Sequence, residues 1–231
     1  RIPHSMHFEG TVKESGNLLN TVNSIIGIDY YQKDKKLLGT PYSQFLKFMF
    51  TLKNTFRITE TTTLATRVQL GAVWTYGNSR YAPYSELFYV GGANSVRAFA
   101  VRSIGPGSYQ DREGRGTYLD QAGDMKFELN AEYRFPIVNA LQGAFFIDAG
   151  NVWLMREDAA HPGGKFRFSR LLKDMAVGTG LGVRYDLEFL ILRLDLGIGI
   201  HAPYDTGKSG YYNIKKFSDG LGFHFAVGYP F

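Results

Sequence analysis

The chain has 231 residues, with 26 Lys and Arg, 21 Asp and Glu, 27 glycines and no cysteine. The lack of cysteine excludes disulfides, thiolate metal sites and a thiol nucleophile, and the net charge of +5 is not gathered into a nucleic-acid-binding run. No apolar stretch approaches the length of a membrane-spanning helix. The 15% aromatic content is nevertheless typical of membrane β-barrels, whose alternating strands hide an apolar band from hydropathy averages.

The residue pattern of the N-terminal third predicts three strands and one helix. The sequence begins at Arg1 without a methionine or a signal peptide, so we expect a processed product or an excised fragment. Alternation of apolar and polar residues predicts a weak strand around residues 2–12 and stronger strands around 45–53 and 62–75. A short helix is expected over 17–27, inside the first long connection.

The strand expected over residues 124–135 shows the alternation most plainly. One face carries Met125, Phe127, Leu129, Ala131, Tyr133 and Phe135, and the other carries Lys126, Glu128, Asn130, Glu132 and Arg134. A helix would mix these residues on each face, so the segment is a two-faced strand. The same pattern predicts strands over 141–153, 175–185, 190–200 and 221–231, which brings the expected total to eight.

Connection lengths alternate along the chain. Short turns near 59–60, 138–140 and 186–188 separate long loops near 17–41, 78–120, 154–173 and 202–218. Outer-membrane barrels have tight periplasmic turns and long outer loops. We therefore predict an all-β, antiparallel transmembrane barrel in the bacterial outer membrane, with its long loops extracellular and the C-terminal Phe231 at the periplasmic end.

A soluble lipocalin-like barrel with its leucines and phenylalanines inside is the alternative, because it shows the same alternation. The reverse soluble arrangement is implausible, since it would pack a large set of charges into a dry core. That set comprises Arg67, Lys126, Glu128, Glu132, Arg134, Asp148, Arg184, Arg193 and Asp195.

No catalytic constellation is predicted. The five histidines lack paired metal-ligand spacing, and no serine lies in a GxSxG context. The glycines of residues 178–182 alternate along a strand, which fits close strand packing or room for a plug in the lumen better than a phosphate loop. Glu132 and Asp148 as a glycosidase pair find no further support. We expect a non-enzyme with no metal, no cofactor and no nucleic-acid partner.

The longest loop carries an apolar centre around Arg97, with Gly91-Gly92 and Gly105-Pro106-Gly107 as corners. We infer that this loop folds back and buries Arg97, and that its partners inside a barrel are carboxylates facing the lumen. The alternative is an ordinary solvated arginine on an extracellular loop.

Several stretches resemble the BamA/TamA outer-membrane assembly superfamily. Residues 91–99, Gly-Gly-Ala-Asn-Ser-Val-Arg-Ala-Phe, resemble its signature loop, whose core reads Val-Arg-Gly-Phe, with Ala98 in place of the glycine. Residues 132–136 and 146–153 resemble two of its strands, and 223–231 resembles its closing strand, with Gly228 as the kink glycine. The likeness covers about residues 60–231, and the run 102–108 is similar to Bacteroidetes members, including the TamA-like lipoprotein branch (TamL).

The resemblance implies a structural latch and a lateral seam. Arg97 would enter the lumen and bind Glu132 and Asp148, with Val96 and Phe99 as its loop neighbours. Phe223, Phe225, Gly228 and Phe231 would form the closing strand at the seam. Residues 1–231 would be the C-terminal half of a barrel of about sixteen strands, with the other strands and POTRA domains before Arg1.

The implied function is folding and insertion of client β-barrel proteins into the outer-membrane bilayer, together with periplasmic or lipoprotein accessory subunits. Three other readings stay open. The barrel could be a polypeptide exporter or channel, the membrane domain of a patatin-type secreted lipase whose hydrolase motif lies upstream, or a self-contained eight-stranded barrel of the adhesin type.

Overall fold

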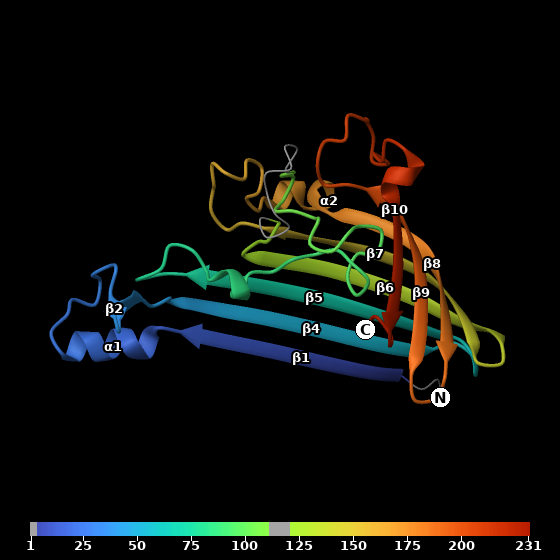
Figure 1. Ribbon diagram of the computed structural model, residues 1–231, viewed down its shortest axis with the longest axis horizontal. Coiled ribbons are helices and arrows are strands. Elements are labelled where there is room, and N and C mark those ends of the chain that lie inside the picture. The colour runs from blue at the N-terminus through green and yellow to red at the C-terminus, as the bar shows by residue number, and fades with distance from the viewer. Residues whose placement is uncertain (1–3, 111–120) are drawn as a thin grey trace.

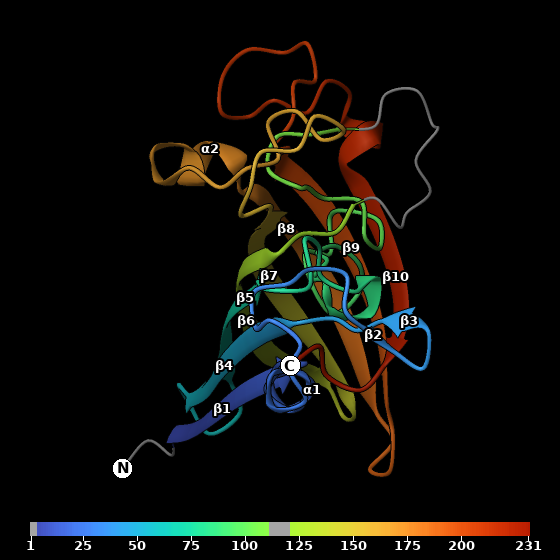
Figure 2. The ribbon, with the colours of Figure 1, turned by 90° about the vertical axis from the view of Figure 1, so that its left-hand side faces the viewer.

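The computed structural model describes residues 4–110 and 121–231, which form an eight-stranded antiparallel sheet with two small helices and short 3-10 turns. The strand order is β1-β4-β5-β6-β7-β8-β9-β10, so each strand lies beside its neighbour along the chain (Figure 1). The strands are β1 (His4–Ser15), β4 (Phe45–Arg57), β5 (Thr63–Thr75), β6 (Met125–Val138), β7 (Leu141–Trp153), β8 (Ala176–Asp186), β9 (Ile191–His201) and β10 (Leu221–Val227). The sheet curves into a trough with a concave and a convex face (Figure 2).

The eight expected strands are confirmed, and so is the alternation of their connections. Short turns join β4 to β5, β6 to β7 and β8 to β9 at one end of the sheet, and the long loops all lie at the other end. Two parts of the expected elements, residues 2–3 of the first strand and 111–120 of the longest loop, lie outside the described residues.

The long connections contain the remaining secondary structure. The expected helix is confirmed as α1 (Asn17–Ile25), and β2 (Lys36–Leu37) pairs with β3 (Thr40–Pro41) beyond it. Among the described residues, the 3-10 turns are η1 (Tyr84–Glu86), η3 (Phe168–Arg170) and η4 (Phe217–Gly220), and η3 leads into α2 (Leu171–Asp174). Within the described ranges, no helix is long and apolar enough to cross a bilayer.

The two faces of the sheet differ in chemistry. The convex face exposes large apolar side chains, including Ile147 at 58% and Phe225 at 64% of their surface. The charged face is the concave one, and it is covered by the 88–110 loop. An apolar core of Val90, Val96, Phe99 and Ile104 from that loop packs with Val152 and Ala176 of the sheet. This excludes the lipocalin-like alternative, whose apolar faces would point inward.

The closing strand is shorter than its alternation predicts. Strand β10 ends at Val227, whereas the pattern extends it to Phe231. Gly228 has a φ of +83°, a left-handed conformation that takes the chain out of the sheet. The tail then folds back over the concave face, so Phe231 does not lie at the short-turn end of the sheet where it was expected.

Candidate functional site

The longest loop forms a compact fold against the concave face. Isolated bridges pair Phe88 with Gly123 and Val90 with Ile104, which fixes the base of the loop to itself and to the start of β6. Gly91 and Gly92 both have positive φ, and the Gly92 amide donates to the Phe99 carbonyl at 3.0 Å. The enclosed turn therefore directs its centre toward the sheet, where Val96 is fully buried.

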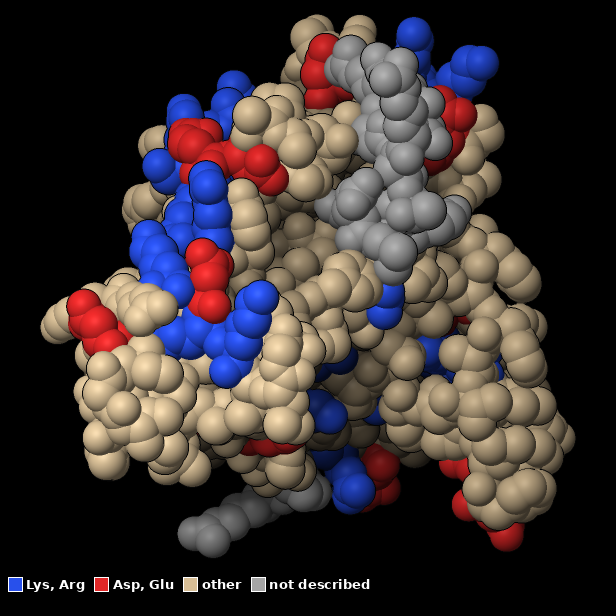
Figure 3. Space-filling model, turned by 60° about the vertical axis from the view of Figure 1, so that its left-hand side comes forward, with Lys and Arg blue, Asp and Glu red and all other residues tan. Residues whose placement is uncertain are grey.

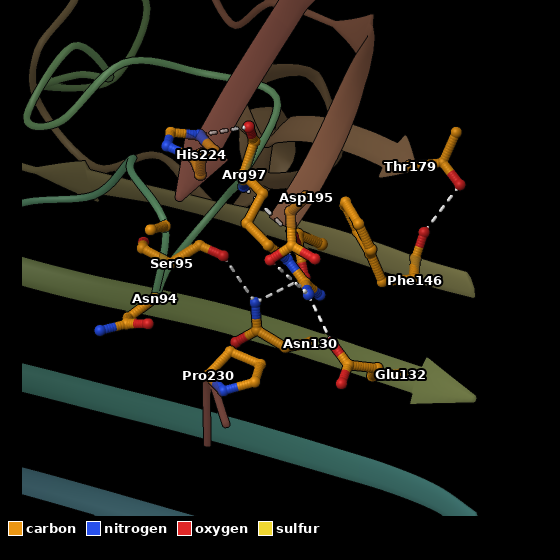
Figure 4. A network of polar contacts seen from close by, with 12 residues as sticks. Asn94, Ser95, Arg97, Asn130, Glu132, Phe146, Thr179, Asp195, His224 and Pro230 are labelled. Carbon is orange, nitrogen blue, oxygen red and sulfur yellow. Dashed lines mark hydrogen bonds and ion pairs between the residues drawn. The ribbon is translucent and has the colours of Figure 1, made fainter. Parts of the chain in front are cut away.

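Arg97 lies at the tip of this turn with its guanidinium buried among carboxylates (Figure 4). Its Nε and Nη2 atoms donate to the two oxygens of Asp148 at 2.8 and 2.9 Å, and its backbone amide donates to the same carboxylate at 3.1 Å. Nη1 donates to Glu132 at 2.5 Å. The structure thus brings together the three side chains that the resemblance paired, one from the loop, one from β6 and one from β7.

Electrostatics keeps Arg97 ionised. Burial alone lowers the pKa of Arg97, but the hydrogen bonds and negative charges of Asp148 and Glu132 outweigh it and raise that pKa above its usual value. The guanidinium also lies 3.5 Å from the centroid of the Phe146 ring, a cation–π contact. A buried ionised pair of this kind is expensive to open from one side, because the remaining charge is left without a partner.

Asn130 connects the loop backbone to Asp148, a contact that the sequence did not predict. Its side-chain amide donates to the Ser95 carbonyl at 3.0 Å and to Asp148 at 2.9 Å. Its oxygen accepts from Arg67 Nε at 3.0 Å, and Ser95 Oγ donates to Glu128 at 2.7 Å. Asn130 has the same parity in β6 as Glu128 and Glu132, so strand alternation was the available signal.

The latch belongs to a larger network of charges on the concave face. Among the described residues, five buried arginines meet four buried carboxylates there: Arg67, Arg97, Arg134, Arg184, Arg193, Glu128, Glu132, Asp148 and Asp195. Glu132 is a hub, since Arg134 and Arg184 contact it at 2.7 and 2.8 Å in addition to Arg97. Alternation placed these residues on one face but did not show which would touch.

Glycines of three neighbouring strands make room for the loop. A Cβ on Gly197 of β9 or Gly222 of β10 would lie 2.4 Å from the Arg97 carbonyl oxygen, and one on Gly178 of β8 would lie 2.4 Å from the Ala98 Cβ. In β8, Gly178 therefore provides space for the loop, whereas a Cβ on Gly180 would lie 2.2 Å from the Leu196 carbonyl oxygen, so that glycine serves close packing within the sheet. The φ angle of Ala98 is not positive, so alanine fits at this position without backbone strain.

The seam residues divide between two environments. Phe223 and Phe225 lie in β10 with 70% and 64% of their surface exposed on the convex face. Beyond Gly228, the Tyr229 ring stacks on Arg134 at 4.0 Å and the Phe231 ring on Arg67 at 5.1 Å, both on the concave face. The predicted set is thus two phenylalanines exposed on the convex face, followed by a kink and a tail that turns toward the concave face.

The arrangement is suited to holding a loop rather than to catalysis. Glu132 and Asp148 each accept hydrogen bonds from arginine side chains, so neither is available as the protonated acid of a glycosidase pair. In the described part of the chain, no group of three or more metal-ligating side chains is gathered.

Known proteins share sequence with this chain. A family model described as the Omp85 superfamily domain matches residues 16–231. The outer membrane protein assembly factor BamA of Neisseria meningitidis serogroup B is 32% identical over 103 residues, covering 42% of this chain and 12% of that protein.

A solved structure has a similar fold. BamA from Haemophilus ducreyi lacking POTRA domains 1–3 aligns with 83% of this chain and 36% of its own, at 18% identity and a TM-score of 0.55. The alignment with CdiB from Acinetobacter baumannii covers 97% of this chain and 38% of the CdiB chain. Its TM-score of 0.40 and identity of 14% are too low to indicate a shared fold. The chain therefore spans well under two thirds of the proteins it matches.

Proposed function

Because the chain belongs to the Omp85 superfamily of outer-membrane proteins, we propose that it forms the C-terminal half of an assembly barrel that folds and inserts client β-barrel proteins. Strand β1 would continue into upstream strands of the same barrel, which has about sixteen strands in the resembling family. Two observations support this proposal: in the described part of the chain, β1 and β10 each pair with one strand only, and the chain spans a small share of each relative.

The observation that carries the function is the short edge strand β10. It has 7 residues, against 11 in its neighbour β9, and it ends at the Gly228 kink. On its outer edge, β10 has no strand neighbour among the described residues, so its N–H and C=O groups lack ladder partners there. In hydrocarbon each such group costs several kcal/mol, about 2–7 by transfer measurements, and a client strand satisfies them by β-augmentation.

The Arg97 latch would support this seam from inside the barrel. Arg97, Glu132 and Asp148 hold the loop against β6 and β7, and the loop backbone in turn contacts β9 and β10. A rigid wall beside a poorly paired edge confines opening to the seam. Binding and insertion then need no chemical turnover, and the seam returns to its starting state when the client leaves.

This function also implies an orientation of the barrel in the membrane and a set of partners. The long loops and α2 would face outside, the short turns would face the periplasm, and POTRA domains with periplasmic or lipoprotein subunits would deliver clients to the turn side. The partners would be the outer-membrane bilayer and unfolded client barrels.

Site-specific photo-crosslinking tests the function directly. A photoreactive amino acid replaces Phe225 in β10 of the full-length protein, and the control position is Ile147 in β7, which is equally exposed on the convex face but lies inside the sheet. We expect several client barrel precursors to crosslink at Phe225 during their assembly and none at Ile147.

The rival functions predict other results. A polypeptide exporter would crosslink one secreted substrate from positions inside the lumen, and a channel would show conductance independent of β10. A lipase barrel would crosslink no clients at Phe225 and would carry hydrolase activity in the full-length protein. Any of these outcomes rejects the insertion function.

A further inference from the structure

An apolar groove of about 520 Å³ lies on the convex face, at the long-loop end of the sheet. Its floor comes from strands β4 to β6, and its overhanging wall comes from the loop after β7, which projects from the convex side as η3 and α2 (Figure 2). The residues that form it include Phe48, Leu70, Phe127, Phe166, Phe168 and Leu171. Almost all of the surface inside this groove is apolar, so it fits a hydrocarbon chain.

The overhanging segment also exposes apolar side chains beyond the groove. Phe168 and Leu172 have 81% and 77% of their surface exposed. Exposed apolar surface next to an apolar groove marks a place where an apolar partner binds.

A buried indole at the groove lacks a hydrogen-bond acceptor. Trp153 of β7 lines the groove, is 1% exposed, and packs edge-to-face on Phe166 with 5.5 Å between ring centroids. Its Nε1–H has no acceptor among the described residues. Buried donors are almost always paired, because an unpaired one loses its bond to water without replacement. An ester or amide carbonyl at the head of an acyl chain would supply that acceptor.

Cations alternate with the apolar residues of the same segment. Lys165, Arg167, Arg170 and Lys173 lie among Phe166, Phe168, Leu171 and Leu172. Two carboxylates pair with them: Glu157 contacts Arg167 at 3.1 Å and Lys165 at 3.8 Å, and Asp174 contacts Arg170 at 3.0 Å. No carboxylate of the described residues pairs with the Lys173 ammonium. The segment therefore keeps excess positive charge. Figure 3 shows Lys and Arg side chains, interleaved with Asp and Glu, at the upper left of the molecule.

We propose that this groove is a binding site for a phosphorylated, acylated glycolipid of the outer leaflet, of the lipid A type. One acyl chain would fill the groove, its ester or amide carbonyl would accept from Trp153 Nε1, and a phosphate would bind Arg167 and Lys173. The choice of the outer leaflet rests on the orientation in the proposed function, in which the long loops face outside. Charge complementarity selects an anionic lipid, since four cations of this segment face only Glu157 and Asp174, and Lys173 pairs with no carboxylate of the described residues.

Native mass spectrometry of the full-length protein, released from detergent, tests the site with bisphosphorylated lipid A as the probe. Ala72→Trp fills the groove without removing a polar contact, because Ala72 lies at its floor. Arg167→Gln with Lys173→Gln removes two cations, and Lys215→Gln with Lys216→Gln is the matched control on another exposed loop. Heat-modifiability on SDS gels shows that each variant is folded.

We expect one tightly held lipid A on the wild-type protein and on the Lys215/Lys216 control. Ala72→Trp and the Arg167/Lys173 variant should each bind about tenfold more weakly, the loss expected for one or two charge-assisted contacts or an excluded chain. Dephosphorylated lipid A should bind the wild-type protein and the Arg167/Lys173 variant equally. Equal binding of lipid A by all folded variants, or equally tight binding of phosphatidylglycerol, would overturn the proposal.

A separate readout distinguishes failure of this site from failure of the proposed orientation. The chain contains no cysteine, so Lys215→Cys, on the exposed loop before β10 and outside the groove, introduces a single thiol into it. We expect a membrane-impermeant maleimide to label that thiol on intact cells. Labelling with unchanged lipid A binding across the variants rejects the lipid site alone, and protection from the maleimide rejects the orientation and the outer-leaflet lipid with it. Client crosslinking at Phe225 is scored independently of both.

Discussion

The Nε2 atom of His224 lies 2.8 Å from the backbone carbonyl oxygen of Arg97, so the closing strand donates a hydrogen bond to the residue at the centre of the latch. The Arg97 side chain meanwhile holds β6 and β7. One loop residue therefore connects two central strands with the edge strand β10, whose ladder partner in the described structure is β9. We therefore expect the stability of the Arg97 contacts and the pairing of β10 to be coupled through this hydrogen bond.

Replacing His224 with leucine should loosen β10 selectively. The substitution removes the donor to Arg97 at a cost of about 1 kcal/mol, and leaves the Arg97–Asp148 pair intact. Hydrogen exchange of the full-length protein in nanodiscs should show faster exchange in β10 and unchanged protection in β6 and β7. His224→Gln keeps a side-chain donor and should stay closer to wild type. An unchanged rate in β10 would show that the two elements are not coupled.

Replacing Arg97 with alanine should lower both barrel stability and assembly activity. The buried Asp148 carboxylate loses its arginine and Glu132 loses one of its three, and breaking a buried pair from one side costs about 3–5 kcal/mol. We expect loss of heat-modified migration at a lower temperature, a lower urea midpoint and reduced levels of client barrels. Arg102→Ala, in the same loop but bound to the exposed Tyr84 hydroxyl, is the control. Normal migration with normal client levels would refute the latch.

Adding a methyl group to Gly197 or Gly222 should displace the loop. The new Cβ would lie 2.4 Å from the Arg97 carbonyl oxygen, closer than real Cβ contacts allow, and that oxygen belongs to the backbone and cannot swing away. Gly197→Ala and Gly222→Ala should lower the urea midpoint and expose residues 88–110 to proteases. Gly10→Ala on β1, whose Cβ would meet Phe50 at an ordinary 3.4 Å, should leave both unchanged. Identical behaviour of the three variants would mean that the loop does not rest on these glycines.

Acid should release the base of the loop at Glu86. A hydrogen bond from Lys13 lowers the pKa of Glu86 below its usual 4.5. A second hydrogen bond, from Lys47 Nζ to the Glu86 carboxylate at 3.3 Å, lowers this pKa further. Since the folded pKa is the lower one, this stabilisation is complete above about pH 4.5 and is lost as the pH falls through the folded pKa. Protection factors of residues 84–90, corrected for intrinsic exchange, should fall over that range. Glu86→Gln should remove this part of the pH dependence; an equal fall in that variant would assign it to other carboxylates.

Gly228 should tolerate asparagine better than alanine. Nothing lies within 4 Å of a Cβ there, so the penalty comes only from its φ of +83°, about 1–2 kcal/mol for an ordinary L-residue. Asparagine visits this conformation more readily. Gly228→Ala should therefore favour a straighter β10 and weaken the stacking of Tyr229 on Arg134, seen as reduced protection of the tail in hydrogen exchange. Equal protection in the two variants would show that the tail does not depend on the kink.

Much of the fold followed from the sequence alone. In a strand, side chains alternate between faces, so the charged set from Arg67 to Asp195 and the outward set ending in Phe225 could be assigned without coordinates. The lengths of the connections predicted which strands form hairpins and that the long loops lie together at one end of the sheet. The pairing of Arg97 with Glu132 and Asp148 came from resemblance, and parity agreed because both acids fall on the concave face.

Only the tertiary structure decided which of these residues touch. Periodicity orders side chains along one strand, but contacts between strands far apart in the chain depend on sheet curvature and on the path of the loop. Three features arise from that path: the contact of His224 with Arg97, the close approach of Ala98 to glycines of the sheet, and the groove beneath Phe168. The predicted end of β10 was wrong for a related reason. The left-handed conformation of Gly228 turns residues 229–231 out of the sheet, although their apolar alternation is typical of a strand.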